Sequence, residues 1–391
     1  MKVIVVGAGV LGTGVARSLT LAGAEVLLLD RRGPGAGTSS TTFAWTNANR
    51  KPDPDYYRLN LAGMAEHEEL ARELPGEPAY FRSGGVQFAD ADSEPWLAEN
   101  VERLRGLGYP ARWVTRAEAA PLVRGLRIPE ETTAIAHFPA EGYVRPDRLV
   151  QNLLADAVRH GAVLSIGEVV STSDGASVTP SDGASVTLAD GTVHTADQVV
   201  LATGRWTGDL AAHSGIDLPM ITDTGRGSPL VGLLGYVRAL DLGCVVHTPG
   251  LNLRPGAGLP AVVQALDLNP EVDPARPPAP GGEIATTITR RLTALLPDPG
   301  QAPEIDFRVG FRALPADGHP IAGYPPEHPR TYCLASHGGI TLAPLLGRLV
   351  ATEILTGEAQ ELLEPFRPSR LTGVRRADLP AVGRPVKLGE Q

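Results

Sequence analysis

The first thirty residues alternate between short apolar runs and glycine-rich breaks. The run Lys2–Val6 (KVIVV) is rich in Val and ends at a glycine, which predicts a buried parallel strand. Apolar residues then recur at helical spacing over residues 11–22, and Gly23 ends this predicted helix. A second apolar run, Glu25–Asp30 (EVLLLD), predicts another strand. The pattern is that of a βαβ unit.

The glycines of this unit have the spacing of a dinucleotide-binding loop. Gly7, Gly9 and Gly12 form Gly-x-Gly-x-x-Gly between the first strand and the helix, which is the context that this motif requires. They would permit a tight turn, a close approach of a pyrophosphate, and close packing of the helix against the strand, respectively. Asp30 ends the second strand, where a carboxylate can accept hydrogen bonds from a ribose 2′-hydroxyl. The unit therefore predicts a site for an adenine dinucleotide.

The pattern further along the chain favours FAD over NAD. Instead of more βαβ repeats, residues 33–60 are rich in Gly, Ser, Thr, Asn and Pro, which indicates a functional loop, and a helix is predicted at about 56–74. Downstream, "DGTVHTADQVVLATGRW" predicts a hairpin turn and then the strand Gln198–Ala202. In "TYCLASHGGITLAPLLGRLVATEILTGE" we expect a strand, a turn over Ser336–Thr341 and a helix ended by Gly357. Both segments would bring backbone groups up to a flavin.

Three other stretches complete the predicted organisation. A helix near Arg145–His160 is followed by a strand, and "LNLRPGAGLPAVVQALD" predicts two strands joined at Pro255–Gly258. The heptapeptide "SDGASVT" occurs at 173–179 and again at 181–187, which we interpret as a duplication lengthening a surface hairpin. The stretch 269–283 is a Pro-rich connector.

Composition narrows the class of protein. The 391 residues allow two domains, and the formal charge of −9 argues against a nucleic-acid partner. Cys244 and Cys333 are the only cysteines, so we expect no disulfide framework and a reducing, cytoplasmic compartment. No apolar run approaches the ~20 residues that span a bilayer, and we expect neither a signal peptide nor a membrane span. No Cys/His cluster suggests a metal site.

The motifs, taken in order, resemble those of the D-amino-acid oxidase superfamily. The glycine motif with Asp30 is followed by "VVLATGRW", "GFRALPADGHPIAG" and "SHGGITLAPLLGRLVATEI", and the resemblance extends to about Arg370. Closer relatives within that superfamily include glycine oxidase, sarcosine oxidase and D-amino-acid dehydrogenase. The resemblance implies an α/β fold: a discontinuous Rossmann-like FAD-binding domain with an interleaved, antiparallel-sheet α+β substrate domain.

On this reading the FAD domain comprises residues 1–80, 143–215 and 308–368, and the substrate domain comprises 81–142 and 216–307. Residues 369–391 are expected to form a poorly ordered tail. The implied activity is oxidation of an amino acid or secondary amine to an imine, by hydride transfer to the flavin, and hydrolysis follows. The electrons then pass to O₂ or another acceptor, and the oligomeric state stays open. Alternatives are an NAD-dependent dehydrogenase, a non-catalytic or partner-subunit flavoprotein, and a tRNA-modifying relative, which the acidic charge disfavours.

The resemblance also gives candidates for the chemistry. Arg312 matches the arginine that binds the substrate carboxylate in glycine oxidase, although it could instead pair with Asp317. Arg254 faces either the pocket or solvent, and His337 lies in the turn near the flavin. Lys51 is the one lysine placed to promote reaction with oxygen, as a lysine does in sarcosine oxidases. No cysteine lies where sarcosine oxidases attach FAD, so we expect noncovalent FAD.

The candidate FAD-binding residues come from all three predicted segments of the FAD domain. They are Gly7, Gly9, Val10, Leu11, Gly12, Asp30, Arg31, Thr38, Ser39, Thr42, Val169, Ala202, Thr203, Gly204, Trp206, Arg312, His337, Gly338, Gly339, Ile340 and Thr341.

Overall fold

The computed structural model describes residues 1–175, 183–298, 300, 303–374 and 378–379. Five of its strands form a parallel core, in which β1 lies between β2 and β13 and the first βαβ unit appears as the sequence predicts. The whole sheet has six strands in the order β19-β20-β13-β1-β2-β9, with only β19 antiparallel to its neighbour. These strands are β1 (Lys2–Val6), β2 (Glu25–Asp30), β9 (Val163–Ile166), β13 (Gln198–Leu201), β19 (Ile321–Gly323) and β20 (Thr331–Ala335).

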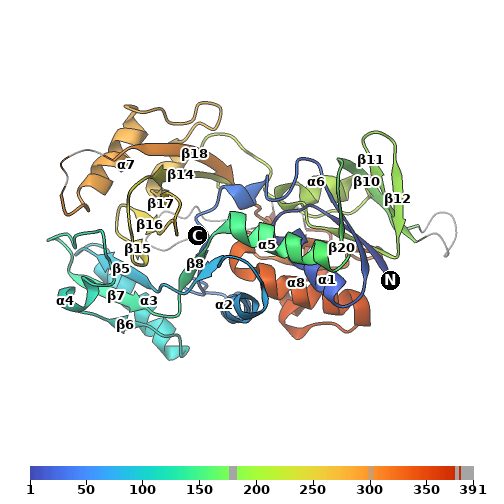
Figure 1. The fold of residues 1–391 in the computed structure, drawn as a ribbon, viewed down its shortest axis with the longest axis horizontal. Coiled ribbons are helices and arrows are strands. Elements are labelled where there is room, and N and C mark those ends of the chain that lie inside the picture. Colours follow the sequence, from blue (N-terminus) through green and yellow to red (C-terminus); the bar gives the residue numbers. More distant parts are fainter. Residues whose placement is uncertain (176–182, 299, 301–302, 375–377, 380–391) are drawn as a thin grey trace.

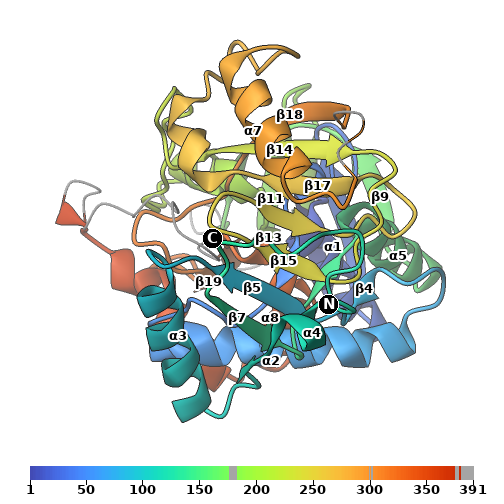
Figure 2. The same ribbon diagram turned by 90° about the vertical axis from the view of Figure 1, so that its left-hand side faces the viewer.

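Four helices pack beside this sheet and beside one another. The helix α1 (Val10–Leu21) lies between α5 (Pro146–Arg159) and α8 (Gly339–Thr356), and α8 also packs on α2 (Pro54–Glu73). These helices gather at the side of the N-terminus in Figure 1, and Figure 2 shows α2 running along the base of the molecule. By length and composition α8 could cross a membrane, but 78% of its apolar window is buried inside the protein.

A second sheet has eight strands. All of its neighbouring strands are antiparallel except β15 and β5, which pair in parallel. Its order is β18-β14-β17-β16-β15-β5-β7-β6. Side chains on one face, with Val86, Leu233 and Val246 among them, form a core against α7 (Glu283–Thr293). The strands are β5 (Gly85–Ala89), β6 (Arg112–Trp113), β7 (Ala134–Phe138), β14 (Val231–Val237), β15 (Val245–His247), β16 (Asn252–Arg254), β17 (Ala261–Gln264) and β18 (Ile305–Phe311).

Two small three-stranded sheets complete the strands in the part of the chain that the structure describes. One contains β3 (Trp45–Thr46), β8 (Gly142–Val144) and β4 (Tyr80–Phe81), and its aromatic residues pack on the inner face of the eight-stranded sheet. The other contains β10 (Val169–Ser173), β11 (Ala184–Leu188) and β12 (Val193–Ala196). Short helices α3 (Glu94–Gly106), α4 (Arg116–Ala119) and α6 (Thr207–Ala212) complete the α-helical elements among the described residues. The predicted α/β fold with a second, mainly antiparallel domain is confirmed.

The boundaries of several predicted elements differ from the structure for local reasons. α2 begins at Pro54 because Asp53 caps it, accepting a hydrogen bond from the Tyr56 amide at 2.7 Å. α8 begins at Gly339, so the turn after β20 is shorter than predicted. The predicted boundary at residue 308 lies inside β18, which pairs with β14 along its whole length from Ile305 to Phe311. The three-segment division of the FAD domain stays a proposal.

The predicted tail and duplication are described only in part. Residues 368–371 form a short 3₁₀ helix in which Leu371 is buried, so the first residues of the predicted tail are ordered. Residues 375–377 and 380–391 lie outside the described residues. The duplicated heptapeptide does lie on the hairpin formed by β10 and β11, but residues 176–182, which contain the second half of its first copy, also lie outside them.

Candidate active site

The glycine motif brings the start of α1 against the ends of β1 and β13. Gly7 has φ +104°, and a Cβ atom there would lie 2.4 Å from the Ala202 carbonyl oxygen. A Cβ atom on Gly12 would lie 1.8 Å from the Gly7 carbonyl oxygen. Gly9 is the N-cap of α1 and provides no side chain to cap it. The first amide groups of α1 therefore face the space above the strand ends, which suits a pyrophosphate.

Asp30 holds the loops around this space together. One carboxylate oxygen accepts the Ala8 amide at 2.9 Å, and the other accepts the amides of Arg32 and Gly33, each at 2.8 Å. A carboxylate has about four acceptor positions, so a ribose hydroxyl could still donate to Asp30. Its position at the end of β2, beside the glycine loop, is that of the ribose-binding acid.

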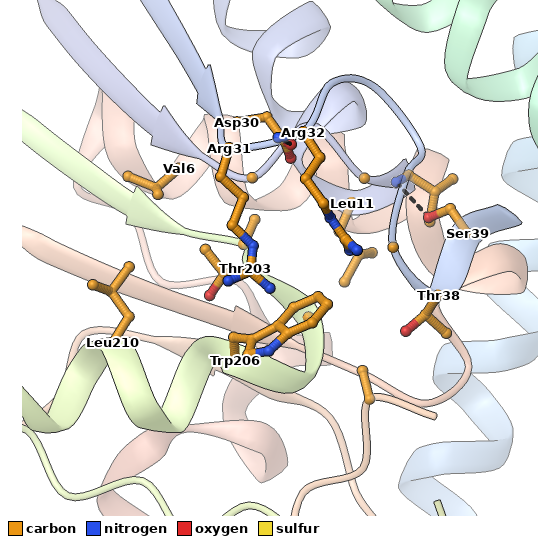
Figure 3. Close-up of a pocket in the computed structure, with 18 of the residues that line it drawn as sticks. Val6, Leu11, Asp30, Arg31, Arg32, Thr38, Ser39, Thr203, Trp206 and Leu210 are labelled. Carbon is orange, nitrogen blue, oxygen red and sulfur yellow. Dashed lines mark hydrogen bonds between the residues drawn. The ribbon is translucent and has the colours of Figure 1, made fainter. Parts of the chain in front are cut away.

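An elongated cavity begins at Asp30 and ends at the start of α8 (Figure 3). Most of the predicted FAD-binding residues line it, although they come from six separate parts of the chain. Gly12 packs behind the cavity instead of lining it. The lining candidates are Gly7, Gly9, Val10, Leu11, Asp30, Arg31, Thr38, Ser39, Thr42, Val169, Ala202, Thr203, Gly204, Trp206, His337, Gly339 and Ile340.

Sequence reasoning missed other residues of this cavity. Glu168 and Leu210 carry no motif, and Arg32 is not among the candidate FAD-binding residues. The guanidinium carbons of Arg31, Arg32 and Arg205 lie 4.2, 5.2 and 4.1 Å from the centre of the Trp206 ring. Figure 3 shows Arg31 and Arg32 above the indole, beside Asp30. This end of the cavity therefore offers an aromatic face and positive charge, which suit an adenosine and its phosphate.

The other end of the cavity is formed by α8. Its N-cap, Gly338, makes no side-chain capping bond, so the amides of its first turn are free of side-chain caps. Gly339 and Ile340 line the first cavity, and Gly338 and Thr341 line a second cavity beside it. A helix N-terminus at this place favours negative charge on a bound group.

The second cavity lies between α8 and the inner face of the eight-stranded sheet. Gly232, Leu234, Gln264 and Gly310 line it from the sheet, and Phe43 and Trp45 line it from the loop before β3 and from β3. It shares four lining residues with the first cavity: Thr38, Thr42, His337 and Ile340. The two cavities are therefore neighbours with a common wall.

Arg312 projects into the second cavity from the end of β18. Its Nη1 donates to the carbonyl oxygens of Pro229, at 3.0 Å, and Val231, at 2.7 Å. Arg312 forms no ion pair with any described residue, and Asp317 is instead paired with Arg370 at 2.8 Å. Removal from bulk water lowers the pKa of Arg312 to about 10, so it stays charged at neutral pH. The cavity thus contains a guanidinium without a carboxylate partner, which an anionic group would complete.

His337 lies in the wall that the two cavities share. Burial, together with the positive charges of Arg312 and Lys51, lowers its pKa to about 3. The imidazole is therefore neutral at physiological pH. It could accept or donate a hydrogen bond to a bound molecule, but it would be a weak base.

Lys51 is buried near this wall but does not line either cavity. Its Nζ lies 5.6 Å from the centre of the Tyr56 ring. Burial lowers its pKa to about 8, against the attraction of the Glu141 carboxylate, which raises it. Lys51 can therefore influence the charge around His337 without touching a molecule in the cavity.

Arg254 is buried on β16 and does not line the second cavity. Its guanidinium carbon lies 5.5 Å from the centre of the Tyr143 ring, and Nη1 donates to the Pro255 carbonyl at 2.8 Å. The expectation that it faces solvent is therefore wrong, and the expectation that it faces the pocket stays a prediction. The pattern of alternating residues in β16 places it on the inner face of the sheet, but Tyr143 packs beside it.

The cysteines and the remaining ionisable groups add no further reactive centre to these cavities. Cys244 and Cys333 are both buried as free thiols, and burial raises the pKa of Cys244 to about 12. Neither lines either cavity. Among the described residues, no group of three or more His, Cys, Asp or Glu side chains could hold a metal ion.

Comparison with known proteins agrees with this geometry. A family model described as FAD dependent oxidoreductase matches residues 2–353. The oxidoreductase YurR of Bacillus subtilis (strain 168) is 25% identical over 390 residues, which cover 94% of this chain and 98% of YurR. The crystal structure of glycine oxidase from Geobacillus kaustophilus superposes with a TM-score of 0.80 at 25% identity, covering 94% of this chain and 99% of that chain.

One relative is longer than this chain. The tRNA 5-methylaminomethyl-2-thiouridine biosynthesis bifunctional protein MnmC of Chromohalobacter salexigens is 26% identical over 413 residues. The match covers 94% of this chain but 56% of that protein, so this chain spans about half the length of the bifunctional relative.

Proposed function

Because the chain belongs to the FAD-dependent oxidoreductase family, we propose that it oxidises the C–N bond of an amino acid or secondary amine that carries a carboxylate. FAD, and not NAD, is the cofactor of this family. The product is an imine, which water hydrolyses to a carbonyl compound and an amine or ammonia. The observation that carries this proposal is Arg312, a guanidinium without an acidic partner beside the cavity of the glycine loop.

The first cavity fits FAD along its whole length. Asp30 and Trp206 lie at one end, the start of α1 lies in the middle with its Val10 amide bound to the Ser39 hydroxyl at 3.1 Å, and the start of α8 lies at the other end. This order matches ribose and adenine, then pyrophosphate, then flavin. FAD, when bound, supplies the acceptor for the hydride that leaves the substrate carbon.

The residues of the second cavity would orient the substrate. Arg312 would bind the substrate carboxylate through the guanidinium nitrogens that form no hydrogen bond with described residues. The apolar walls of Phe43, Trp45 and Leu234 would exclude water from the reacting carbon. Neutral His337 would lie beside the amine and accept a hydrogen bond from it, because the imidazole faces both cavities.

A proton must also leave the amine for the imine to form. Lys51, with a pKa of about 8, would hold part of its population as a neutral amine at mildly alkaline pH. Because Lys51 does not line the cavity, we propose that its charge affects the site electrostatically. Solvent, and not Lys51, would accept the proton that leaves the substrate amine. The experiment below distinguishes O₂ from another oxidant as the electron acceptor.

The test is an absorbance titration of the purified holoprotein. Anaerobic mixing with a panel of amino acids and N-methylamino acids should bleach the flavin band with at least one member of the panel. Recovery of colour on admission of air would identify an oxidase, and persistent bleaching would identify a dehydrogenase. A flavin that no amine in the panel reduces would contradict the proposed activity.

A further inference from the structure

We propose that Glu141 is a positioning residue for the substrate cavity, acting through the indole of Trp45. The proposal rests on the proposed function in one respect, namely that the cavity beside Arg312 receives a carboxylate ligand. It concerns a side chain that lies outside the cavity and carries no sequence motif. Glu141 immediately precedes β8 and is fully buried, with 0% of its surface exposed.

The carboxylate of Glu141 accepts hydrogen bonds from three sides. Its Oε2 accepts the indole Nε1–H of Trp45 at 3.0 Å. Its Oε1 accepts from the Asn49 side-chain amide at 3.0 Å and from the Tyr109 hydroxyl at 3.1 Å. The orientation of Asn49 is itself fixed, because its Oδ1 accepts from Asn100 at 2.7 Å. The carboxylate thus joins the loop that follows β3 to a tyrosine next to α3.

Glu141 forms no ion pair within the described ranges of the chain, although the charge of Lys51 attracts its carboxylate. Burial raises the pKa of Glu141 to about 8, so much of it is protonated at neutral pH. A buried acid, whether charged or protonated, is destabilising in comparison with an apolar side chain of similar volume. Three donors offset part of that cost, but they would not be needed if the position were apolar. We therefore explain the arrangement by the side-chain orientation that it fixes, and not by a net gain in the free energy of folding.

What it fixes is Trp45, a residue that lines the second cavity. The indole packs against His247, with 4.3 Å between the ring centroids. The Trp45 carbonyl oxygen accepts the Thr341 hydroxyl at 3.3 Å, and its backbone pairs with Tyr143. The hydrogen bond to Glu141 sets the direction of the indole N–H and thereby the orientation of a side chain whose residue lines the cavity.

The carboxylate itself has little freedom to move. A Cβ atom on Gly85 would lie 2.4 Å from Glu141 Oε2, so this part of β5 accepts only glycine while the carboxylate stays in place. The Gly84 amide also donates to the Glu141 carbonyl oxygen at 2.8 Å. Glu141 is thereby anchored to the eight-stranded sheet, and its hydrogen bond to the indole links Trp45 to that anchor.

The experiment measures binding of acetate to the holoprotein from the change in the flavin absorbance spectrum, so it needs no turnover. Glu141→Met keeps an unbranched side chain but removes the acceptor, and we expect the Kd for acetate to rise about tenfold. Glu141→Gln can still accept from Trp45 and donate to the Tyr109 hydroxyl, although its amide group then faces the Asn49 amide group, and it should bind acetate more tightly than Glu141→Met does. Tyr109→Phe removes a partner of the other carboxylate oxygen and should leave the Kd within about twofold.

A double-mutant cycle shows whether Glu141 acts through the indole. Trp45→Phe alone should weaken acetate binding to a similar degree, and Glu141→Met should add nothing further in that background. Additive effects would overturn the proposal, as would a Glu141→Met protein whose Kd is unchanged while its Tm falls. If Glu141→Met yields no folded holoprotein, an unchanged Kd for Trp45→Phe overturns the proposal, and a tenfold rise supports it.

These outcomes are separate from those of the proposed function. Arg312→Ala should abolish acetate binding and so identifies the site that the titration reports. If acetate binds in this way but no amine reduces the flavin, the proposed oxidation fails while the role of Glu141 can still be decided.

Discussion

Asp317 forms an ion pair with Arg370, 2.8 Å from Nε, and not with Arg312, which lies five residues before it in the chain. The sequence alone allowed either partner. Because the acid is already paired, and because Arg312 forms no other ion pair among the described residues, its charge is available to a ligand. The proposal of a substrate that carries a carboxylate depends on Arg312 being unpaired while Asp317 is paired.

Removing the Arg312 charge should therefore abolish activity without loss of the cofactor. We expect Arg312→Ala to lower kcat/KM for a reactive amino acid by about 10²–10³-fold, as expected for loss of a charged hydrogen-bonding partner. Arg308→Ala is the matched control, since Arg308 lies on β18 four residues before Arg312, is exposed and pairs with Asp306. Stopped-flow flavin reduction measures both. Equal losses in the two variants would contradict the role given to Arg312.

Gly12 should tolerate no side chain. The Cβ atom of Gly12→Ala would lie 1.8 Å from the Gly7 carbonyl oxygen, so α1 must move away from β1 and the glycine loop must change shape. We expect a protein that contains little or no FAD, measured as the ratio of flavin to protein absorbance. Gly106→Ala, at the end of α3 with no atom within 4 Å of its added Cβ, should keep its FAD and gain about 0.5 kcal/mol of stability.

His67 should make the fold sensitive to acid. It is buried between α2 and α8, where it bonds to the Ile340 carbonyl oxygen at 2.8 Å, and burial lowers its pKa to about 4. The unfolded chain binds a proton near pH 6.5 and the folded chain does not until about pH 4. Its contribution is thus complete above pH 6.5 and is lost as the pH falls towards 4.

At pH 5 this loss amounts to about 2 kcal/mol for one such histidine. Thermal unfolding gives the change in stability between pH 7 and pH 5 for the wild type and for His67→Gln. The difference between these two changes is the contribution of His67. The variant should lose less stability between the two pH values than the wild type does. The same loss in both proteins would show that His67 is not the residue that titrates.

FAD should leave the protein on denaturation. The only two cysteines are buried, and neither lines the FAD cavity, so neither is placed to attach the flavin. After acid precipitation the yellow colour should remain in the supernatant, and the denatured polypeptide should show no flavin fluorescence on a gel. Flavin fluorescence that stays with the polypeptide would show a covalent bond to another side chain.

The parts of the molecule that the sequence predicts well are those with local determinants. The three glycines fix a turn within six residues, and the strands β1 and β2 follow from short apolar runs, so the start of the FAD cavity is predictable. Gly357 likewise marks the end of α8, where its φ is +74°. Resemblance to a family then adds the residues of α8 and Arg312.

The substrate cavity is harder to predict because its walls meet through long-range pairing. Trp45 and Gln264 are more than 200 residues apart, and no period or motif connects them. Glu141 illustrates the limit further: an acid before a glycine normally indicates an exposed turn. Its burial depends on three hydrogen-bond donors from residues 45, 49 and 109, which are far from it in the sequence and meet it only in the folded chain.

The wall that the two cavities share has a consequence for the order in which the complex assembles. His337 and Ile340 each present one side to the dinucleotide cavity and another to the space beside Arg312. A dinucleotide that binds first would therefore also set the positions of side chains that a carboxylate ligand meets. We accordingly expect the complete substrate site only in the holoprotein, with the dinucleotide bound before the carboxylate.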